Sequence, residues 1–217
     1  MSPRTREQNE EIRKQRKKEI LQAAIRVYVD KGYAASDMGD IADRAGLAHG
    51  LVYYYFKNKK TLFRELYEYM MEESRRATET YFAQEGDAPD LLRGYARMVC
   101  ERVLDDSAIS RFYARISLDL HHLYTPEEIS PFAWVKSFMG PMTRAIEKGI
   151  SQGAIPHGDA RLLAMQFWGA VSQGMAYLDQ AQHQLAAQGI PDAEMKARLN
   201  QPLDQVVESS LLLFKPQ

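Results

Sequence analysis

Residues 40–62 of this chain read DIADRAGLAHGLVYYYFKNKKTL, and this stretch decides the fold. Its first part overlaps a predicted helix whose apolar residues are three and four positions apart, namely Met38, Ile41, Ala42 and Ala45. Gly46 ends that helix, because glycine takes up the left-handed conformation of a tight turn at little cost. Residues 48–56 then form a second helix, too short to be stable without neighbours. We therefore predict a helix-turn-helix between Asp37 and Phe56, with its second helix able to lie in a major groove of DNA.

A longer helix is expected ahead of this motif. Its apolar face is formed by Leu21, Ala24, Ile25 and Tyr28. We expect it to stop at Gly32, and either Ser36 or Asp37 can cap the helix that follows. Residues 4–18 precede this helix as a charge-rich arm.

Helical spacing continues to the end of the chain, and strand-like alternation is scarce, so the predicted fold class is all-α. Asn58 can cap a helix over 59–82, and Asp159 can cap another. The further helices are expected at 90–105, 108–123, 131–152, 160–187 and 202–214. Residues 125–128 (TPEE) have the form of a capping box and should open a short helical turn. Pro141 should kink its helix, and residues 189–191 mark a break.

Charge is distributed unevenly along the chain. The net charge of all 217 residues is −1, but residues 1–60 hold 13 Lys and Arg against 8 Asp and Glu. A basic head on an acidic body favours a polyanionic partner for the head. The single cysteine, Cys100, excludes an intrachain disulfide, and neither a signal peptide nor a long apolar segment is evident. We expect a cytoplasmic protein with no membrane partner.

Glycine and tyrosine in the second helix of the motif point to contact with DNA. Gly50 lies inside this helix, where it costs about 1 kcal/mol in helix propensity relative to alanine. That cost is reasonable where a base or a backbone must come close. The adjoining run from Tyr53 to Lys60 places hydroxyl and ammonium groups side by side, and both commonly contact phosphates. Three neighbouring tyrosines cannot all face a core, because successive residues of a helix point about 100° apart.

With these features, residues 15–65 closely resemble the tetracycline-repressor (TetR) family of bacterial regulators. The rest of the chain resembles that family only as a helical body of suitable length. The resemblance implies that His49, Gly50 and Tyr53 meet base edges and that Tyr54, Tyr55 and Lys59 meet phosphates. We add three residues to the predicted DNA contacts, namely Ser36, Asp37 and Lys17.

The chain also departs from the family pattern. Ala48 stands where a serine or threonine is common, and Leu51 replaces a commonly polar residue. Met38 and Gly39 remove polar side chains from the start of the preceding helix. Each change reduces the number of possible DNA contacts. We expect the basic arm ahead of the motif, Arg13 to Lys18, to compensate by adding charge near the DNA backbone.

The resemblance divides the chain into a DNA-binding domain over residues 1–60 and a helical ligand-binding and dimerisation domain over 61–217. Methionine and aromatic side chains form adaptable walls for an apolar or aromatic effector. The candidates for this pocket are Tyr67, Met71, Tyr95, Met98, Phe112, Tyr113, Ile116, Phe138, Met142, Trp168 and Gln173.

The last two long helices are the expected surface of a homodimer. The helix that begins near Asp159 has two apolar stripes, so it should have two neighbours, the body and a second subunit. The residues assigned to the dimer are Phe167, Val171, Gly174, Leu178, Val207, Leu211 and Phe214. A second stripe of smaller residues, Gly169, Gln173 and Ala176, would also permit close approach.

The function expected from these features is a regulator, a repressor that a small molecule releases from double-stranded operator DNA. One alternative is a DNA-binding regulator without a small ligand. Another is an enzyme with a vestigial head, for which Asp119, His121 and His122 are the only catalytic candidates. We expect no catalytic residue, no cofactor and no metal, since adjacent histidines on a helix point in different directions. Cys100 is expected to be a small buried side chain.

Overall fold

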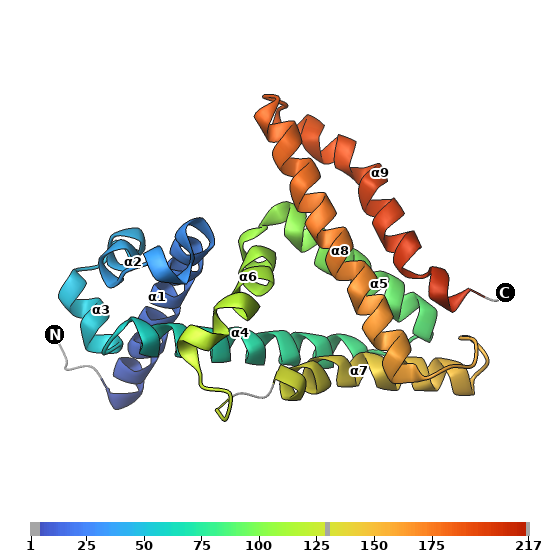
Figure 1. The fold of residues 1–217 in the computed structure, drawn as a ribbon, viewed down its shortest axis with the longest axis horizontal. Helices are drawn as coiled ribbons and strands as arrows, with labels where there is room; N and C mark the ends of the chain where they lie inside the picture. Colours follow the sequence, from blue (N-terminus) through green and yellow to red (C-terminus); the bar gives the residue numbers. More distant parts are fainter. Residues whose placement is uncertain (1–4, 129–130, 216–217) are drawn as a thin grey trace. The chain divides into compact units, whose positions relative to one another are not determined.

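The computed structural model describes residues 5–128 and 131–215, with the side chains of 131–136 excepted, and within them helices are joined by loops and turns (Figure 1). The helices are α1 (Arg6–Ala35), α2 (Met38–Ala45), α3 (His49–Tyr55), α4 (Lys59–Phe82), α5 (Ala88–Asp105), α6 (Ala108–Leu123), α7 (Pro131–Ser151), α8 (Ala160–Ala187), α9 (Asp192–Ser210) and the short 3-10 helix η1 (Leu212–Phe214). The described residues contain no strand, and the all-α prediction is confirmed.

The chain forms two compact units whose limits differ from the expected division at residue 60. The first holds the described residues 5–71 and 111–128, and the second holds 72–110 and 131–215. Helix α4 begins in the first unit and ends in the second. The first unit therefore includes most of α6 as well as the helix-turn-helix.

The charged segment at the start of the chain is helical rather than an arm. Helix α1 begins at Arg6, where the Thr5 hydroxyl accepts from the Gln8 backbone N–H and the Gln8 side chain accepts from the Thr5 N–H. This reciprocal capping box was not recognised in the sequence. Gly32 interrupts the helix as expected, with φ 78° and ψ 174°, and a short helical stretch continues to Ala35.

The turn between α2 and α3 has the predicted local chemistry. The Asp37 carboxylate accepts a hydrogen bond from the Asp40 N–H over 2.7 Å and so caps α2. Gly46 adopts the left-handed conformation, with φ 66° and ψ 33°. The Asn58 side chain accepts from the Thr61 N–H at the start of α4.

The core of the first unit is aromatic at its centre. Tyr28 of α1 is fully buried, and its ring packs against Phe63 of α4 and Phe112 of α6 at centroid distances of 5.6 and 5.4 Å. Val52 and Phe56 are also fully buried. Val52 lies within α3 and Phe56 directly follows its end, so together they hold one side of α3 inward and leave the opposite side outward.

In the second unit, α5, α7, α8 and α9 share one apolar core. Helix α9 begins at Asp192, ten residues before the predicted start at 202, and the prediction was wrong there because Pro202 lies inside the helix. Pro141 likewise lies inside α7, and Asp159 caps α8. Residues 125–128 form a turn instead of the expected helical turn, with the Glu128 carboxylate accepting from the Thr125 N–H.

Candidate nucleic-acid interface and effector region

The outward face of α3 carries the side chains that the sequence assigned to DNA. Tyr53 and Tyr54 are 54% and 72% exposed, although they are large and aromatic. His49 and Gly50 are exposed on the same short helix, and Tyr55 is half-buried. Because Val52 and Phe56 fill the core, the helix holds these groups in place on its free side.

Gly50 has no packing reason to be glycine within the chain. A Cβ atom built on it would meet no described atom within 4 Å, and its φ is not positive. Alanine would therefore fit the free protein and would favour the helix. Packing among the described residues therefore does not account for glycine at this position.

His49 is held across the turn by Asp43 of α2. The two side chains lie 2.8 Å apart, from Nε2 to the carboxylate oxygen, and both are exposed. Gly39 makes room for the imidazole, because a Cβ there would lie 3.2 Å from His49 Cε1. The missing polar side chain at Gly39 thus has a structural reason that its sequence context did not indicate.

Lys59 is committed to the end of α1 instead of facing outward. Its ammonium donates to the backbone carbonyl oxygens of Tyr33, Ala34 and Ser36 at 2.8, 3.1 and 3.0 Å. It also lies 4.5 Å from the centroid of the Tyr33 ring. An ammonium has three N–H donors, and three carbonyls use them. The prediction of a phosphate contact at Lys59 is not supported by this geometry.

Ser36 and Lys17 are also engaged within the protein. Ser36 is 2% exposed, and its hydroxyl donates to the Gly32 carbonyl over 2.6 Å. A buried hydroxyl that is bonded within the protein cannot contact DNA, so the prediction for Ser36 is corrected. The Lys17 ammonium pairs with Glu65 of α4 at 2.6 Å and lies 5.3 Å from the Phe56 ring centroid. Asp37 is exposed, but its carboxylate caps α2.

Other lysines and arginines of the first unit are better placed for phosphates. Lys57 and Lys60 are exposed on either side of Lys59. Arg13, Lys14 and Lys18 are exposed on the first half of α1. The run of lysines after Phe56 was visible in the sequence, but which of them turns inward depends on where the end of α1 lies.

A partly buried hydrogen bond joins α1 to α6 within the first unit. The Tyr28 hydroxyl donates to the Asp119 carboxylate over 2.7 Å. Burial and this carboxylate raise the pKa of the Tyr28 phenol well above its ordinary value. Arg115 lies beside the pair, since its guanidinium donates to the Val29 carbonyl and would collide with a Cβ at Gly32. In the sequence, Asp119 stood out only beside His121 and His122, as a catalytic or metal-site candidate, and its hydrogen bond with Tyr28 was not predicted.

The predicted effector residues fall into both units and are mostly core. Phe112 and Ile116 are buried in the first unit, which also holds Tyr67, Met71 and Tyr113. In the second unit, the Trp168 ring lies 4.6 Å from Phe138 and 6.3 Å from Tyr95 between centroids. The other predicted residues there are Met98, Met142 and Gln173.

The predicted effector residues line neither of two cavities of about 300 and 310 Å³ in the second unit. Gln173 is exposed and lies outside the core of that unit. The assignment of the effector pocket to these residues remains a prediction.

The residues assigned to the dimer face the inside of the second unit. Phe167, Val171, Leu178 and Val207 are fully buried between α8 and its neighbours. Leu211 and Phe214 belong to the same core, and a Cβ at Gly174 would collide with Val206 of α9. Their assignment is therefore corrected, because side chains buried within one subunit offer no surface to another. The free face of α8 is the second stripe, with Gly169, Gln173 and Ala176 exposed.

The remaining polar candidates form no metal or thiol site in the described part of the chain. No group of three His, Cys, Asp or Glu side chains there could hold a metal ion. The His122 ring stacks on Tyr33 at 5.2 Å. Cys100 is fully buried, which raises the pKa of its thiol to about 12. None of the described helices has the length and apolarity needed to cross a membrane.

Comparison with known proteins bears on this architecture. Residues 20–66 match the family model described as "Bacterial regulatory proteins, tetR family". The fatty acid metabolism regulator protein of Bacillus subtilis is 24% identical over 71% of this chain and 79% of its own length. The HTH-type transcriptional regulator TtgR of Pseudomonas putida is 30% identical over 56% of this chain, and the match spans 55% of that protein.

A solved structure resembles nearly the whole chain. The transcriptional regulator FadR from Bacillus subtilis, determined in complex with stearoyl-CoA, has a TM-score of 0.62 and is 21% identical. The match covers 91% of this chain and 98% of that one. At this identity the likeness concerns the fold.

Proposed function

We propose that this chain, which belongs to the TetR family of bacterial regulatory proteins, is a ligand-responsive repressor of transcription. It is a DNA-binding transcriptional regulator and not an enzyme. The observation that carries the proposal is the exposed aromatic face of α3, where Tyr53 and Tyr54 project beside the open Gly50. Large exposed aromatic side chains next to free lysines fit a surface that nucleic acid covers. We place the protein in the cytoplasm, beside that DNA.

In the proposed complex, α3 lies in a major groove and reads base edges with His49, Gly50 and Tyr53. Tyr54 and Tyr55 contact phosphates, together with the exposed Lys57 and Lys60. These two lysines replace Lys59 in the predicted contact set, because Lys59 holds the end of α1.

A homodimer would place two copies of α3 in successive major grooves, about 34 Å apart or a little more, on a near-palindromic operator. We propose the exposed face of α8 as the dimer surface. Leu162 and Met165 lie on it at 53% and 54% exposure, ahead of the small stripe that starts at Gly169. Large apolar side chains on a surface that no other described residue covers favour a second subunit.

The effector is proposed to be a small molecule with a large apolar part. Methionine and aromatic side chains are abundant in the body, and relatives include a fatty acid metabolism regulator and a regulator bound to stearoyl-CoA. Binding releases DNA only to the extent that the effector prefers the conformer with low DNA affinity.

A mobility-shift titration on the DNA upstream of the chain's own coding sequence tests the proposal. We expect specific binding at moderate salt and release of the DNA by stearoyl-CoA but not by coenzyme A. Absence of sequence-specific binding on this and neighbouring promoters would refute the repressor. Specific binding that no apolar molecule reverses would instead favour a regulator without a small ligand.

A further inference from the structure

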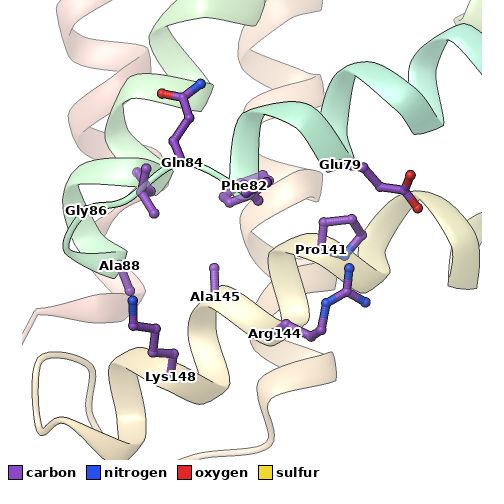
Figure 2. A pocket seen from close by; sticks show the side chains of 11 residues that line it. Glu79, Phe82, Gln84, Gly86, Ala88, Pro141, Arg144, Ala145 and Lys148 are labelled. Atoms are coloured by element: carbon purple, nitrogen blue, oxygen red, sulfur yellow. The ribbon is translucent and has the colours of Figure 1, made fainter.

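A cavity of about 300 Å³ lies in the second unit, and none of the residues that the sequence assigned to an effector lines it. The end of α4, the loop after it, the start of α5 and the middle of α7 form its walls (Figure 2). Its volume is at the lower limit of small-molecule sites, which run from about 300 to 1,000 Å³. The cavity therefore admits a small ligand or one end of a larger one.

The walls of this cavity combine an apolar floor with two cations. Ala145 and Pro141 of α7 are buried and face Phe82 and Leu91 from α4 and α5. Arg144 and Lys148, one helical turn apart on α7, lie on either side of Ala145 (Figure 2). An apolar surface between two basic side chains suits a molecule that carries both an apolar part and a negative charge.

The lining carries two cations, Arg144 and Lys148, against one carboxylate that is already paired. Its carboxylate, Glu79, accepts from Arg75 over 2.7 Å, and this ion pair lies along α4. Figure 2 shows the Glu79 carboxylate pointing away from Ala145. Neither Arg144 nor Lys148 forms an ion pair with any residue in the described ranges. Both cations are thus free to bind an anion, and a guanidinium in particular forms paired hydrogen bonds with carboxylate or phosphate oxygens.

Close packing of α7 against the start of α5 fixes the geometry of the cavity. A Cβ on Gly149 would lie 2.8 Å from the Ala88 Cβ and 2.7 Å from Ile155, so only glycine allows this approach. Lys148, which precedes Gly149, and Ala88, the first residue of α5, both line the cavity (Figure 2).

We propose that this cavity binds an amphiphilic anion, with its carboxylate or phosphate group on Arg144 and Lys148 and its apolar part over Ala145, Phe82 and Leu91. The proposal deepens the proposed function, on which its regulatory consequence rests, by naming a site and a chemical class for the effector. Glu79 and Phe82 belong to the last turn of α4, the helix that begins at Lys59 behind the helix-turn-helix. A ligand seated here contacts the end of that helix directly.

Isothermal titration of the full chain with matched probes tests the site. We expect decanoate and decyl phosphate to bind, and decanol, which has no charge, to bind at least tenfold more weakly. Replacing both cations (Arg144→Gln with Lys148→Gln) should weaken decanoate at least tenfold and leave decanol unchanged. The matched control replaces two exposed cations elsewhere in the same unit, Arg161→Gln with Lys215→Gln, and should bind decanoate as the wild type does.

A third variant tests the apolar floor. Ala145→Leu should weaken all three chain-bearing probes alike, and its circular dichroism and melting temperature show whether it folds. If Ala145→Leu does not fold, the variant of Arg144 and Lys148 still tests the site, because both side chains are exposed. Equal binding of decanoate to the wild type and to the Arg144 and Lys148 variant would overturn the proposed site. If inorganic phosphate bound as tightly as decanoate, the claim that the ligand needs an apolar part would be wrong.

The same variants in the operator mobility shift separate the two proposals. Decanoate that binds through Arg144 and Lys148 without changing the DNA affinity upholds the site and counts against its role as effector. Release of DNA by an apolar molecule with the same midpoint in the wild type and in the variant upholds the repressor and places its effector elsewhere.

Discussion

The ammonium of Lys59, at the start of α4, donates a hydrogen bond to the backbone carbonyl oxygen of Tyr33, near the end of α1, over 2.8 Å. The same ammonium bonds the carbonyls of Ala34 and Ser36, where the last turn of α1 has no further helical partners. Lys59 therefore fixes the position at which α1 ends and α2 begins. A residue placed among phosphate contacts by its sequence context serves here to orient the helix-turn-helix.

Replacing Lys59 by methionine should destabilise the protein without changing the salt dependence of DNA binding. Hydrogen bonds to charged groups contribute about 1.5–3 kcal/mol, and urea denaturation should show a loss of about that size. Lys60→Met is the matched control, because Lys60 is adjacent and exposed. It should leave stability within about 0.5 kcal/mol and lower the slope of log affinity against log salt by about one unit. If Lys59→Met lowered the salt slope and Lys60→Met lowered the stability instead, Lys59 would be the phosphate contact.

Gly50→Ala should change stability and DNA affinity in opposite directions. Alanine has room at this position, since no described atom lies within 4 Å of the added Cβ, and it favours the helix by up to about 1 kcal/mol. The same methyl group would stand between α3 and the DNA. We expect a higher midpoint in urea and weaker operator binding. Improved stability with unchanged affinity would show that DNA does not approach the backbone here.

Local features of the motif were predictable because they depend on neighbours in the sequence. The Asp37 cap and the left-handed Gly46 follow from residue type and position, and both are found. The inward turn of Lys59 and the hydrogen bond from Tyr28 to Asp119 join residues 26 and 91 positions apart. Such pairings depend on how helices cross, which periodicity within one helix does not specify.

The stripes of α8 illustrate the same limit. Two stripes were recognised, but periodicity alone does not say which one packs against the same subunit. The stripe with Phe167, Val171 and Leu178 is internal, and the stripe of smaller side chains is exposed. Apolar burial stabilises in proportion to area, so the larger side chains were the better choice for the core. The start of α9 was also predicted wrongly, at residue 202, whereas the helix begins at Asp192 and Pro202 lies inside it.

Tyr53→Ala should weaken binding to the operator by about 1–3 kcal/mol, the range of a good base contact. Stability should change little, because the side chain is 54% exposed and its ring is not part of the core. Mobility shifts on the operator and on unrelated DNA measure both affinities. Tyr54→Ala serves as the comparison and should weaken both DNAs to a similar extent. An equal loss on both DNAs for Tyr53→Ala would make Tyr53 a phosphate contact instead.

The hydrogen bond between Tyr28 and Asp119 should give a measurable coupling energy. Tyr28→Phe leaves the carboxylate without its buried partner, which costs about 1–3 kcal/mol. A double-mutant cycle with Asp119→Asn should give a coupling of about 0.5–3 kcal/mol by urea denaturation. Tyr33→Phe is the control, since its hydroxyl forms no hydrogen bond among the described residues, and it should be nearly neutral.

The pH dependence of stability provides a second measurement of this bond. The pKa of Tyr28 is raised in the fold, so its contribution is complete below the ordinary tyrosine pKa of about 10 and declines as pH rises through the folded value. The wild type should therefore lose more stability than Tyr28→Phe above pH 10. If the free energy of unfolding fell equally with pH in the two proteins, unfolding would not change the protonation of the Tyr28 phenol.

Met165→Glu should dissociate the proposed homodimer and leave the fold of each subunit intact. The side chain is 54% exposed on the free face of α8, so a carboxylate there is solvated in the monomer and unpaired within an apolar interface. Sedimentation velocity should show a monomer, with circular dichroism unchanged, and binding to a full operator should weaken more than binding to a half-site. Leu118→Glu is the matched control, since Leu118 is also a large apolar side chain, 72% exposed on α6, and its variant should remain dimeric. A dimer that survives Met165→Glu but is lost with Leu118→Glu would move the interface from α8 to α6.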